Sequence, residues 1–306
     1  MEVVNTILDS VFKSDRSILT IGGFDGIHLG HRQIIECGLN LSKKNNLPLV
    51  VITFDPLPKY FFNSNLTYLM STEEKIRKFN SMAIDYLVML KFDSELSNRD
   101  AYTFLSDIVN RFKPKYIVSG SDHRFGLDRK GSIDFLESHS NRFGYSLKVV
   151  PDYKIGDLEI RSSLIRRMIE TSDVYNASRL LGYNYFIKGE VVKGDGLGRE
   201  LGFPTANIVT GESKVTIPAN GVYCVNIEYD SNSFKGMCNI GIRPTVVNDG
   251  LRRIEVHIFS KEDIDLYGQK IKIYFIDFIR SEVKYETKGE LIKQLNEDKK
   301  KCLNMN

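Results

Sequence analysis

The chain has 306 residues, of which 42% are hydrophobic and 26% charged, a balance typical of globular proteins, and the length suggests two domains. No apolar run approaches the roughly 20 residues that cross a bilayer, and residues 1–5 lack the pattern of a secretory signal. A net charge of +3 gives little support to nucleic-acid binding. We therefore expect a soluble, cytoplasmic protein with no membrane or nucleic-acid partner, and its oligomeric state stays open.

Short apolar runs alternate with helical patterns up to about residue 180. The runs predict buried strands at Ile18–Gly22, Leu49–Phe54, Tyr86–Leu90, Tyr116–Ser119 and Leu147–Val150. Apolar residues at three- and four-residue spacing predict helices around His31–Asn45, Thr72–Ser81, Arg99–Phe112 and Ser132–Phe143. This alternation is typical of a parallel, doubly wound sheet, so we expect an α/β domain over residues 1–182.

The pattern changes from about Tyr183 to short alternating segments separated by Gly, Asn and Asp turns. These predict strands at Phe186–Val192, Val222–Glu228, Phe234–Ile240, Ile254–Ile258 and Ile271–Phe278. We therefore expect an antiparallel β-barrel domain over residues 183–306. The segment Leu291–Cys302 has a helical pattern that fits a helix packed on the barrel and an exposed amphipathic tail equally well.

Four cysteines, Cys37, Cys224, Cys238 and Cys302, are far apart along the chain. None of them forms the Cys-x-x-Cys pair that zinc and redox sites favour. We expect all four to be reduced and structural.

A glycine-rich segment, Gly22–His31, follows the first predicted strand. Glycines at a strand end allow the backbone to approach a phosphate, and a helix that begins near His31 would point its N–H groups there. Two imidazoles three residues apart, those of His28 and His31, could donate to phosphate oxygens as charge develops in nucleotidyl transfer. By spacing alone, a glycine-rich turn with two incidental histidines, or a metal pair, fits equally well.

A second glycine-rich segment, Gly189–Asn207, opens the barrel half. Thr205 and Asn207 are two residues apart and so lie on one face of an extended strand, where both offer the oxygen ligands that Mg²⁺ prefers. Read without context, Pro204–Asn207 is an ordinary turn whose side chains bond to the backbone.

The motifs of the first half resemble those of the nucleotidyltransferase domain of prokaryotic bifunctional riboflavin kinase/FAD synthetases. The matching segments are Gly22–His31, Phe54–Pro58, Gly120–Gly126 and Ile160–Arg166. The resemblance implies a Rossmann-like domain that transfers AMP from ATP to FMN, with His28 and His31 stabilising the α-phosphate. It implies nucleotide or flavin contacts for Gly23, Phe24, Asp25, Gly30, Asp122, Ser162, Ser163 and Arg166. Read alone, the serines also suit a helix cap, and Arg166 a surface ion pair.

The second half resembles the riboflavin kinase domain of the same family from residue 185 to 298. The matching segments are Gly198–Asn207, Pro218–Tyr223, Asn239–Thr245, Glu255–Phe259, Leu266–Gly268 and Phe278–Glu282. The resemblance implies that Thr205 and Asn207 hold Mg²⁺ and that Glu255 orients the riboflavin 5′-hydroxyl and accepts its proton. It implies nucleotide or flavin contacts for Gly194, Gly196, Gly198, Arg199, Asn239 and Arg280. On its own, Glu255 is also typical of a surface carboxylate paired with Arg252 or Arg253.

Two departures from the family pattern leave competing hypotheses open. His123 stands where the family has an aromatic residue, and Arg161 replaces a serine. One hypothesis is a riboflavin kinase whose α/β half has lost or weakened adenylyl transfer. A more remote one is a flavin-responsive regulatory protein, since folds are reused without their chemistry. The main hypothesis is an enzyme that uses ATP to convert riboflavin to FMN and FMN to FAD.

Overall fold

The computed structural model describes residues 1–4, 12–193, 197–211, 214–230, 232–242, 252–260 and 266–305. The chain divides into two compact units, Met1–Ser162 and Ser163–Asn306, which are described one at a time. We call them the α/β unit and the barrel unit. Within the described residues, no helix is long and apolar enough to cross a membrane.

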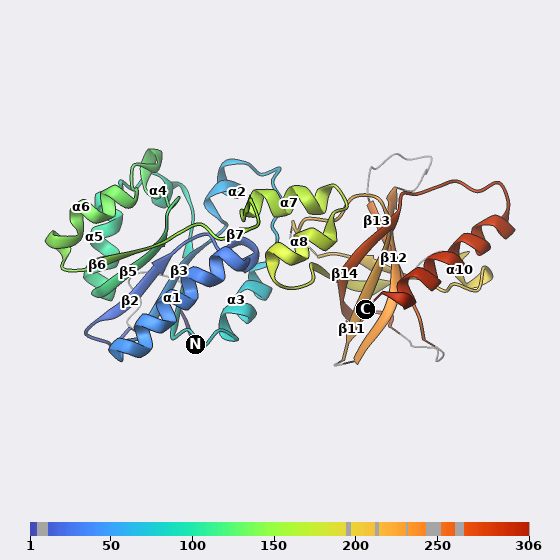
Figure 1. Cartoon of the computed structure of the whole chain (residues 1–306), viewed down its shortest axis with the longest axis horizontal. Coiled ribbons are helices and arrows are strands. Elements are labelled where there is room, and N and C mark those ends of the chain that lie inside the picture. Colours follow the sequence, from blue (N-terminus) through green and yellow to red (C-terminus); the bar gives the residue numbers. More distant parts are fainter. Residues whose placement is uncertain are drawn as a thin grey trace. The chain divides into compact units, whose positions relative to one another are not determined.

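The α/β unit contains a parallel six-stranded sheet in the order β1-β4-β3-β2-β5-β6, of which β2, β3, β5 and β6 are labelled in Figure 1. Its strands are β1 (Glu2–Val4), β2 (Ser17–Ile21), β3 (Leu49–Asp55), β4 (Tyr86–Lys91), β5 (Pro114–Gly120) and β6 (Ser146–Val150). The five predicted strands are confirmed. The prediction missed β1, which at three residues is too short to show a pattern.

Helices connect these strands, as expected of a doubly wound sheet. They are α1 (Leu29–Asn45), α2 (Pro58–Phe62), α3 (Thr72–Asn80), α4 (Ser94–Ser97), α5 (Ala101–Phe112) and α6 (Ile133–Phe143), with the short helices η1 (Asp25–Ile27) and η2 (Leu127–Arg129) and the hairpin β7 (Lys154–Ile155) and β8 (Leu158–Glu159). Side-chain caps define where three of them begin, because Ser71, Asp100 and Ser132 each accept a backbone N–H of the first turn.

The strand order favours a site at the carboxyl ends of the central strands. Strands β2 and β5 are neighbours, and the strand order continues from them toward opposite edges of the sheet, with β3 next to β2 and β6 next to β5. In open α/β sheets, ligands bind at the carboxyl ends of the strands where the order reverses. The glycine-rich segment Gly22–His31 follows β2 at these carboxyl ends, and Gly120–Gly126 follows β5.

The barrel unit is a closed, antiparallel barrel in the order β10-β13-β12-β11-β14-β9. Its strands are β9 (Phe186–Val192), β10 (Ala206–Val209), β11 (Gly221–Tyr229), β12 (Asn232–Ile242), β13 (Arg252–Ile258) and β14 (Lys270–Arg280), and its helices are α7 (Ser162–Glu170), α8 (Val174–Leu181), α9 (Leu197–Glu200) and α10 (Lys288–Asn304). The predicted barrel and the C-terminal helix are confirmed. Helix α8 and nearly all of α7, from the predicted first domain, fall in this unit.

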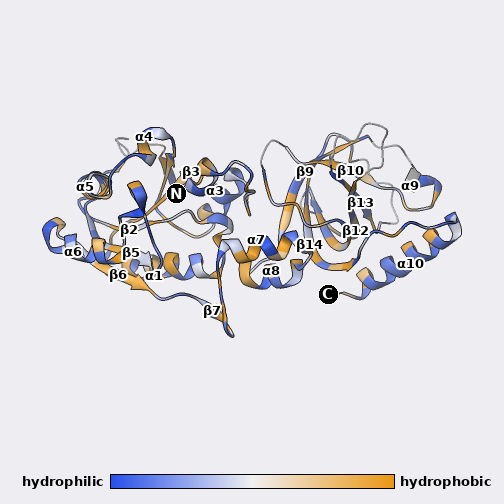
Figure 2. Cartoon of the chain, turned by 90° about the horizontal axis from the view of Figure 1, so that it is seen from above, coloured by the Kyte–Doolittle hydropathy of each residue, from blue (hydrophilic) through white to orange (hydrophobic). Residues whose placement is uncertain are grey.

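Helix α10 packs on the barrel and is not an exposed tail. Its apolar positions alternate with hydrophilic ones (Figure 2), and Ile292, Leu295 and Cys302 join a cluster with Phe203 and other barrel residues. Asp298, whose side chain is fully buried, forms an ion pair with Arg280 of β14. Both contacts fix the helix against the strands.

The expectation of four reduced cysteines is wrong for two of them. Cys224 of β11 and Cys302 of α10 form a disulfide, with their Cα atoms 5.1 Å apart. Packing of α10 on the barrel brings the two together across 78 residues, which no short spacing in the sequence reveals. Cys37 and Cys238 are free thiols, as expected.

Candidate active sites

A tightly fixed loop carries the first candidate site. Phe24 has φ of 48° and Gly26 has φ of 78°, so the loop turns sharply after β2. The buried carboxylate of Asp25 holds this turn, since it accepts the Tyr60 hydroxyl at 2.6 Å and the Leu69 N–H at 2.9 Å and pairs with Lys59 at 3.3 Å. Asp25 therefore contributes by positioning the loop.

Two neutral histidines lie at the N-terminus of α1. His28 caps the helix, with its Nδ1 accepting the His31 backbone N–H at 3.3 Å, and the two rings stack with centroids 3.6 Å apart. Burial lowers the pKa of His28 to about 4. Burial, together with His28 and Lys75 nearby, holds the pKa of His31 well below its ordinary value. An accepting Nδ1 leaves the proton of neutral His28 on Nε2, which can then donate to an anion.

A buried lysine supports the same loop. The ammonium of Lys75, from α3, donates to the carbonyl of Gly23 at 3.2 Å, and Thr53 donates to the same oxygen at 3.1 Å. Burial lowers the pKa of Lys75 to about 8. Lys75 was not among the predicted site residues, because in the sequence it is one lysine within a charged helical segment.

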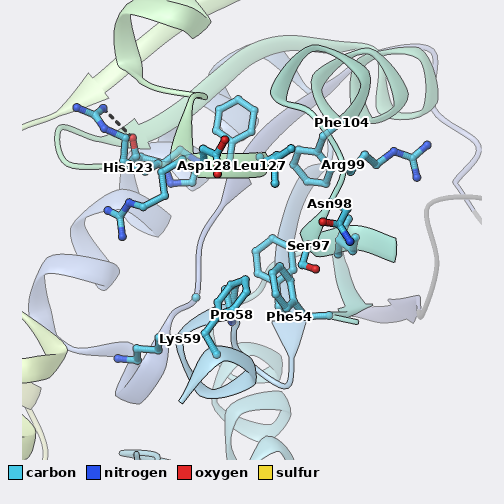
Figure 3. A pocket seen from close by; sticks show the side chains of 18 of the residues that line it. Phe54, Pro58, Lys59, Ser97, Asn98, Arg99, Phe104, His123, Leu127 and Asp128 are labelled. Atoms are coloured by element: carbon cyan, nitrogen blue, oxygen red, sulfur yellow. Dashed lines mark hydrogen bonds between the residues drawn. The ribbon is translucent and has the colours of Figure 1, made fainter. Parts of the chain in front are cut away.

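An aromatic cavity of about 500 Å³ lies at the carboxyl ends of β2, β3, β4 and β5. In Figure 3, His123 and Asp128 lie on one rim, opposite Phe54 and Pro58. The lining comprises Gly22, Gly23, Phe54, Pro58, Lys59, Phe62, Phe92, Leu96, Ser97, Asn98, Arg99, Phe104, His123, Arg124, Phe125, Gly126, Leu127, Asp128 and Arg129. Aromatic walls of this kind suit a flat heteroaromatic ring.

The other predicted residues of this half are less central. Asp122 is exposed in the loop after β5. The Ser162 hydroxyl does not cap α7, because it donates to the Asp25 carbonyl at 3.1 Å. Gly30 lies against the His28 ring, where an added Cβ would be 3.3 Å away. Ser163 and Arg166 belong to α7 in the barrel unit.

In the barrel, three polar residues form a row across neighbouring strands. Asn207 of β10 pairs in register with Glu255 of β13, which pairs in register with Asn239 of β12. Their sequence neighbours Ile254 and Val256 are buried, so the row lies on the outer face of the barrel. A guanidinium nitrogen of Arg253 is 3.8 Å from a carboxylate oxygen of Glu255. This is the ion pair expected if Glu255 were an ordinary surface carboxylate.

Thr205 precedes this row and is exposed. Gly198 of α9 approaches it closely, because a Cβ there would lie 3.1 Å from the Thr205 hydroxyl oxygen. Arg199 is exposed on α9, whereas Gly194 and Gly196 lie outside the described residues. No group of three His, Cys, Asp or Glu suited to a metal occurs among the residues that the structure describes, but Thr205 and Asn207 offer neutral oxygens, which suit Mg²⁺ beside phosphates.

Two further residues with predicted nucleotide or flavin contacts form hydrogen bonds within the barrel unit. Arg280 bonds Asp298 through Nε at 2.9 Å and Nη2 at 2.8 Å. Asn239 donates to Glu282 at 3.3 Å. Their roles toward a nucleotide or flavin stay predictions.

Together, a doubly wound unit with neutral histidines at a helix N-terminus and a barrel with a polar row define a two-part, nucleotide-dependent transferase. A family model described as FAD synthetase matches residues 12–164, and one described as riboflavin kinase matches residues 181–306. The chain belongs to the family of bifunctional riboflavin kinase/FMN adenylyltransferases.

Relatives of that description cover nearly the whole chain. One from Buchnera aphidicola of Acyrthosiphon pisum is 35% identical over 97% of this chain and 96% of the relative, and one from Escherichia coli K12 is 34% identical over 92% and 90%. A solved structure described as a macrolide-efflux protein from Streptococcus pneumoniae is 29% identical, with a TM-score of 0.90 over 100% of this chain and 99% of that chain.

Proposed function

We propose that the barrel unit phosphorylates riboflavin with ATP to give FMN, and that the α/β unit transfers AMP from ATP to FMN to give FAD and pyrophosphate. The row of Asn207, Glu255 and Asn239 is the observation that carries the kinase reaction. A carboxylate between two amides on an open barrel face can orient a hydroxyl without being buried itself.

Glu255 acts as the catalytic residue of the kinase. A carboxylate is a weak base for an alcohol, so it mainly positions the riboflavin 5′-hydroxyl and takes its proton as the new O–P bond forms. Thr205 and Asn207 would hold Mg²⁺, which supplies neutralisation of the charge on the ATP phosphates. Gly198, which is close to Thr205, and Arg199 would contact the nucleotide.

His28 and His31 act electrostatically in adenylyl transfer. Each neutral imidazole donates one hydrogen bond to the α-phosphate of ATP, where charge develops as an FMN phosphate oxygen attacks and pyrophosphate leaves. Burial lowers the pKa of both residues, which supports this role, because each imidazole is then neutral and has one N–H to donate. The N-terminus of α1 adds further attraction for phosphate.

The aromatic cavity takes the three fused rings of FMN. Its volume of about 500 Å³ and its five lining phenylalanines fit a large flat ring better than a small polar group. Gly22 and Gly23 line the cavity and precede His28 in the same loop, so the flavin phosphate can point toward His28.

The test incubates purified protein with riboflavin, ATP and Mg²⁺, separates the flavins by chromatography, and repeats the assay with FMN in place of riboflavin. We expect FMN and FAD in the first assay and FAD in the second. FMN without FAD would leave only the kinase. No product in either assay would refute both reactions and favour a regulatory protein. A cytoplasmic location and a domain boundary at residues 182/183 stay predictions.

A further inference from the structure

His123 holds an unusual place in the aromatic cavity. It is the first residue after Asp122 in the loop that follows β5, where the family has an aromatic side chain. Its ring lies at 26° to that of Phe125, with centroids 5.5 Å apart, and both residues line the cavity. His123 therefore keeps the flat shape of the expected aromatic residue while adding two ring nitrogens.

One of those nitrogens is buried without a partner. Nε2 of His123 is shielded from solvent and has no hydrogen bond to any residue that the structure describes. Burial, with Arg124 and Arg129 nearby, lowers the pKa of His123 to about 4, so the ring is neutral at physiological pH. A buried polar atom without a hydrogen bond destabilises the protein, and a bound molecule that bonds to it removes that cost.

Several other polar side chains of the cavity have partners, whereas Nε of Arg99 is, like Nε2 of His123, buried without one. Ser97 and Asn98 both donate to the Ser94 carbonyl, at 3.1 and 2.8 Å. Lys59 pairs with Asp25. Nε2 of His123 is thus a buried, unpartnered polar atom of a residue that lines the cavity.

We propose that His123 is a specificity-determining residue of the adenylyltransferase, whose Nε2 forms a hydrogen bond with a heteroatom of the flavin ring of FMN. The inference rests on the proposed function, because it requires FMN in this cavity. A flavin offers nitrogen and oxygen atoms along its edges and apolar faces for the phenylalanines. Histidine in place of the aromatic residue then adds a polar contact to the flavin and does not impair the site.

The first test compares His123→Phe, which keeps the ring but removes the nitrogens, with His123→Gln, which keeps a hydrogen-bonding group. We expect His123→Phe to raise KM for FMN in FAD formation about tenfold, by loss of one buried hydrogen bond, while kcat and KM for ATP change little. His123→Gln should recover part of the loss. The control is His139→Phe, a partly buried histidine of the same unit that does not line the cavity.

The second test asks which ring atom is bonded. FMN analogues with one heteroatom removed or blocked (5-deaza-FMN, 1-deaza-FMN and 3-methyl-FMN) are compared as substrates of the wild-type protein and of His123→Phe. We expect the wild type to disfavour one analogue about tenfold and His123→Phe to accept it as well as FMN. A purely structural role of His123 would not produce this selective loss.

Each outcome decides between distinct conclusions. An unchanged KM for FMN, a higher KM for ATP instead, equal analogue preferences in both proteins, or a gain of FAD formation in His123→Phe would overturn the role of His123 while leaving the proposed function intact. A wild-type protein that forms no FAD from FMN would overturn the proposed adenylyl transfer, and the role of His123 with it. Riboflavin kinase activity of the same samples reports that the variants are folded.

Discussion

The two candidate sites of this chain are built in opposite ways. In the α/β unit, Asp25, His28 and Lys75 are buried, and tertiary contacts from several elements fix them. In the barrel unit, Asn207 and Glu255 lie on the outer face of regular strands, where backbone register alone sets their spacing. In the buried site the polar groups are already fixed and shielded from water before substrates bind. In the open site the polar groups are exposed until the substrates cover them. The two sites should therefore respond differently to substitution and pH.

Removing the carboxylate of Glu255 should have the largest effect and leave the other site untouched. We expect Glu255→Gln to lower the kcat of FMN formation about 1,000-fold, because proton acceptance and hydroxyl positioning are both lost. FAD formation from FMN should not change. The matched control is Glu190→Gln, an exposed glutamate of β9 outside the row. A Glu255→Gln protein with near-normal kinase rates would remove the row from the mechanism.

Breaking the pair of Arg280 and Asp298 tests whether Arg280 is structural. We expect Arg280→Met to destabilise the barrel unit by about 3 kcal/mol, because it leaves a fully buried carboxylate unpaired. Urea unfolding measures the effect, and Asp298→Asn in the same background should restore part of it. Lys288→Met, at an exposed ion pair with Glu200, should cost less than about 0.5 kcal/mol. Unchanged stability with a raised KM for ATP or riboflavin would favour a binding role for Arg280.

Substitution of His31 is the counterpart in the α/β unit. We expect His31→Asn to lower the kcat of FAD formation about 100-fold, the typical loss of one donor to a developing charge. Riboflavin phosphorylation should stay unchanged. His139→Asn, outside the site, serves as the control. If both substitutions reduce FAD formation equally, the effect is one of folding and not of catalysis.

Mild acid should weaken the α/β unit more than the barrel. The folded pKa of His28 and of His123 is about 4, below the ordinary 6.5, so the unfolded chain binds more protons between these values. Stability is therefore complete above pH 6.5 and is lost as pH falls toward 4, by about 1–2 kcal/mol for each residue at pH 5. Hydrogen exchange of peptides from each unit at pH 7.5 and 5 measures this. His123→Phe should reduce the pH dependence, and equal losses in both units would contradict it.

The contrast also explains what could be predicted from the sequence. Alternation along β12 and β13 and the glycine-rich segment after β2 depend on local spacing, so these strands and the loop around His28 could be picked out. Glu255 and Asn239 were given roles only by their resemblance to family motifs, and their alignment with Asn207 follows from the strand register. The cavity was missed because its lining comes from five separate segments that only the sheet order brings together. Lys75 was missed because an exposed and a buried lysine look alike in a helical pattern. The shielding of Nε2 in the partly buried His123 likewise depends on tertiary packing.

The bond between Cys224 and Cys302 turns most of the barrel into a covalent ring. Three strands, β12, β13 and β14, lie between its two ends, which are 78 residues apart in the chain. A protease that cuts once anywhere inside this ring releases nothing, because the two pieces stay linked. On a denaturing gel without a thiol the nicked chain would run as a single species, and a thiol would separate it into two fragments.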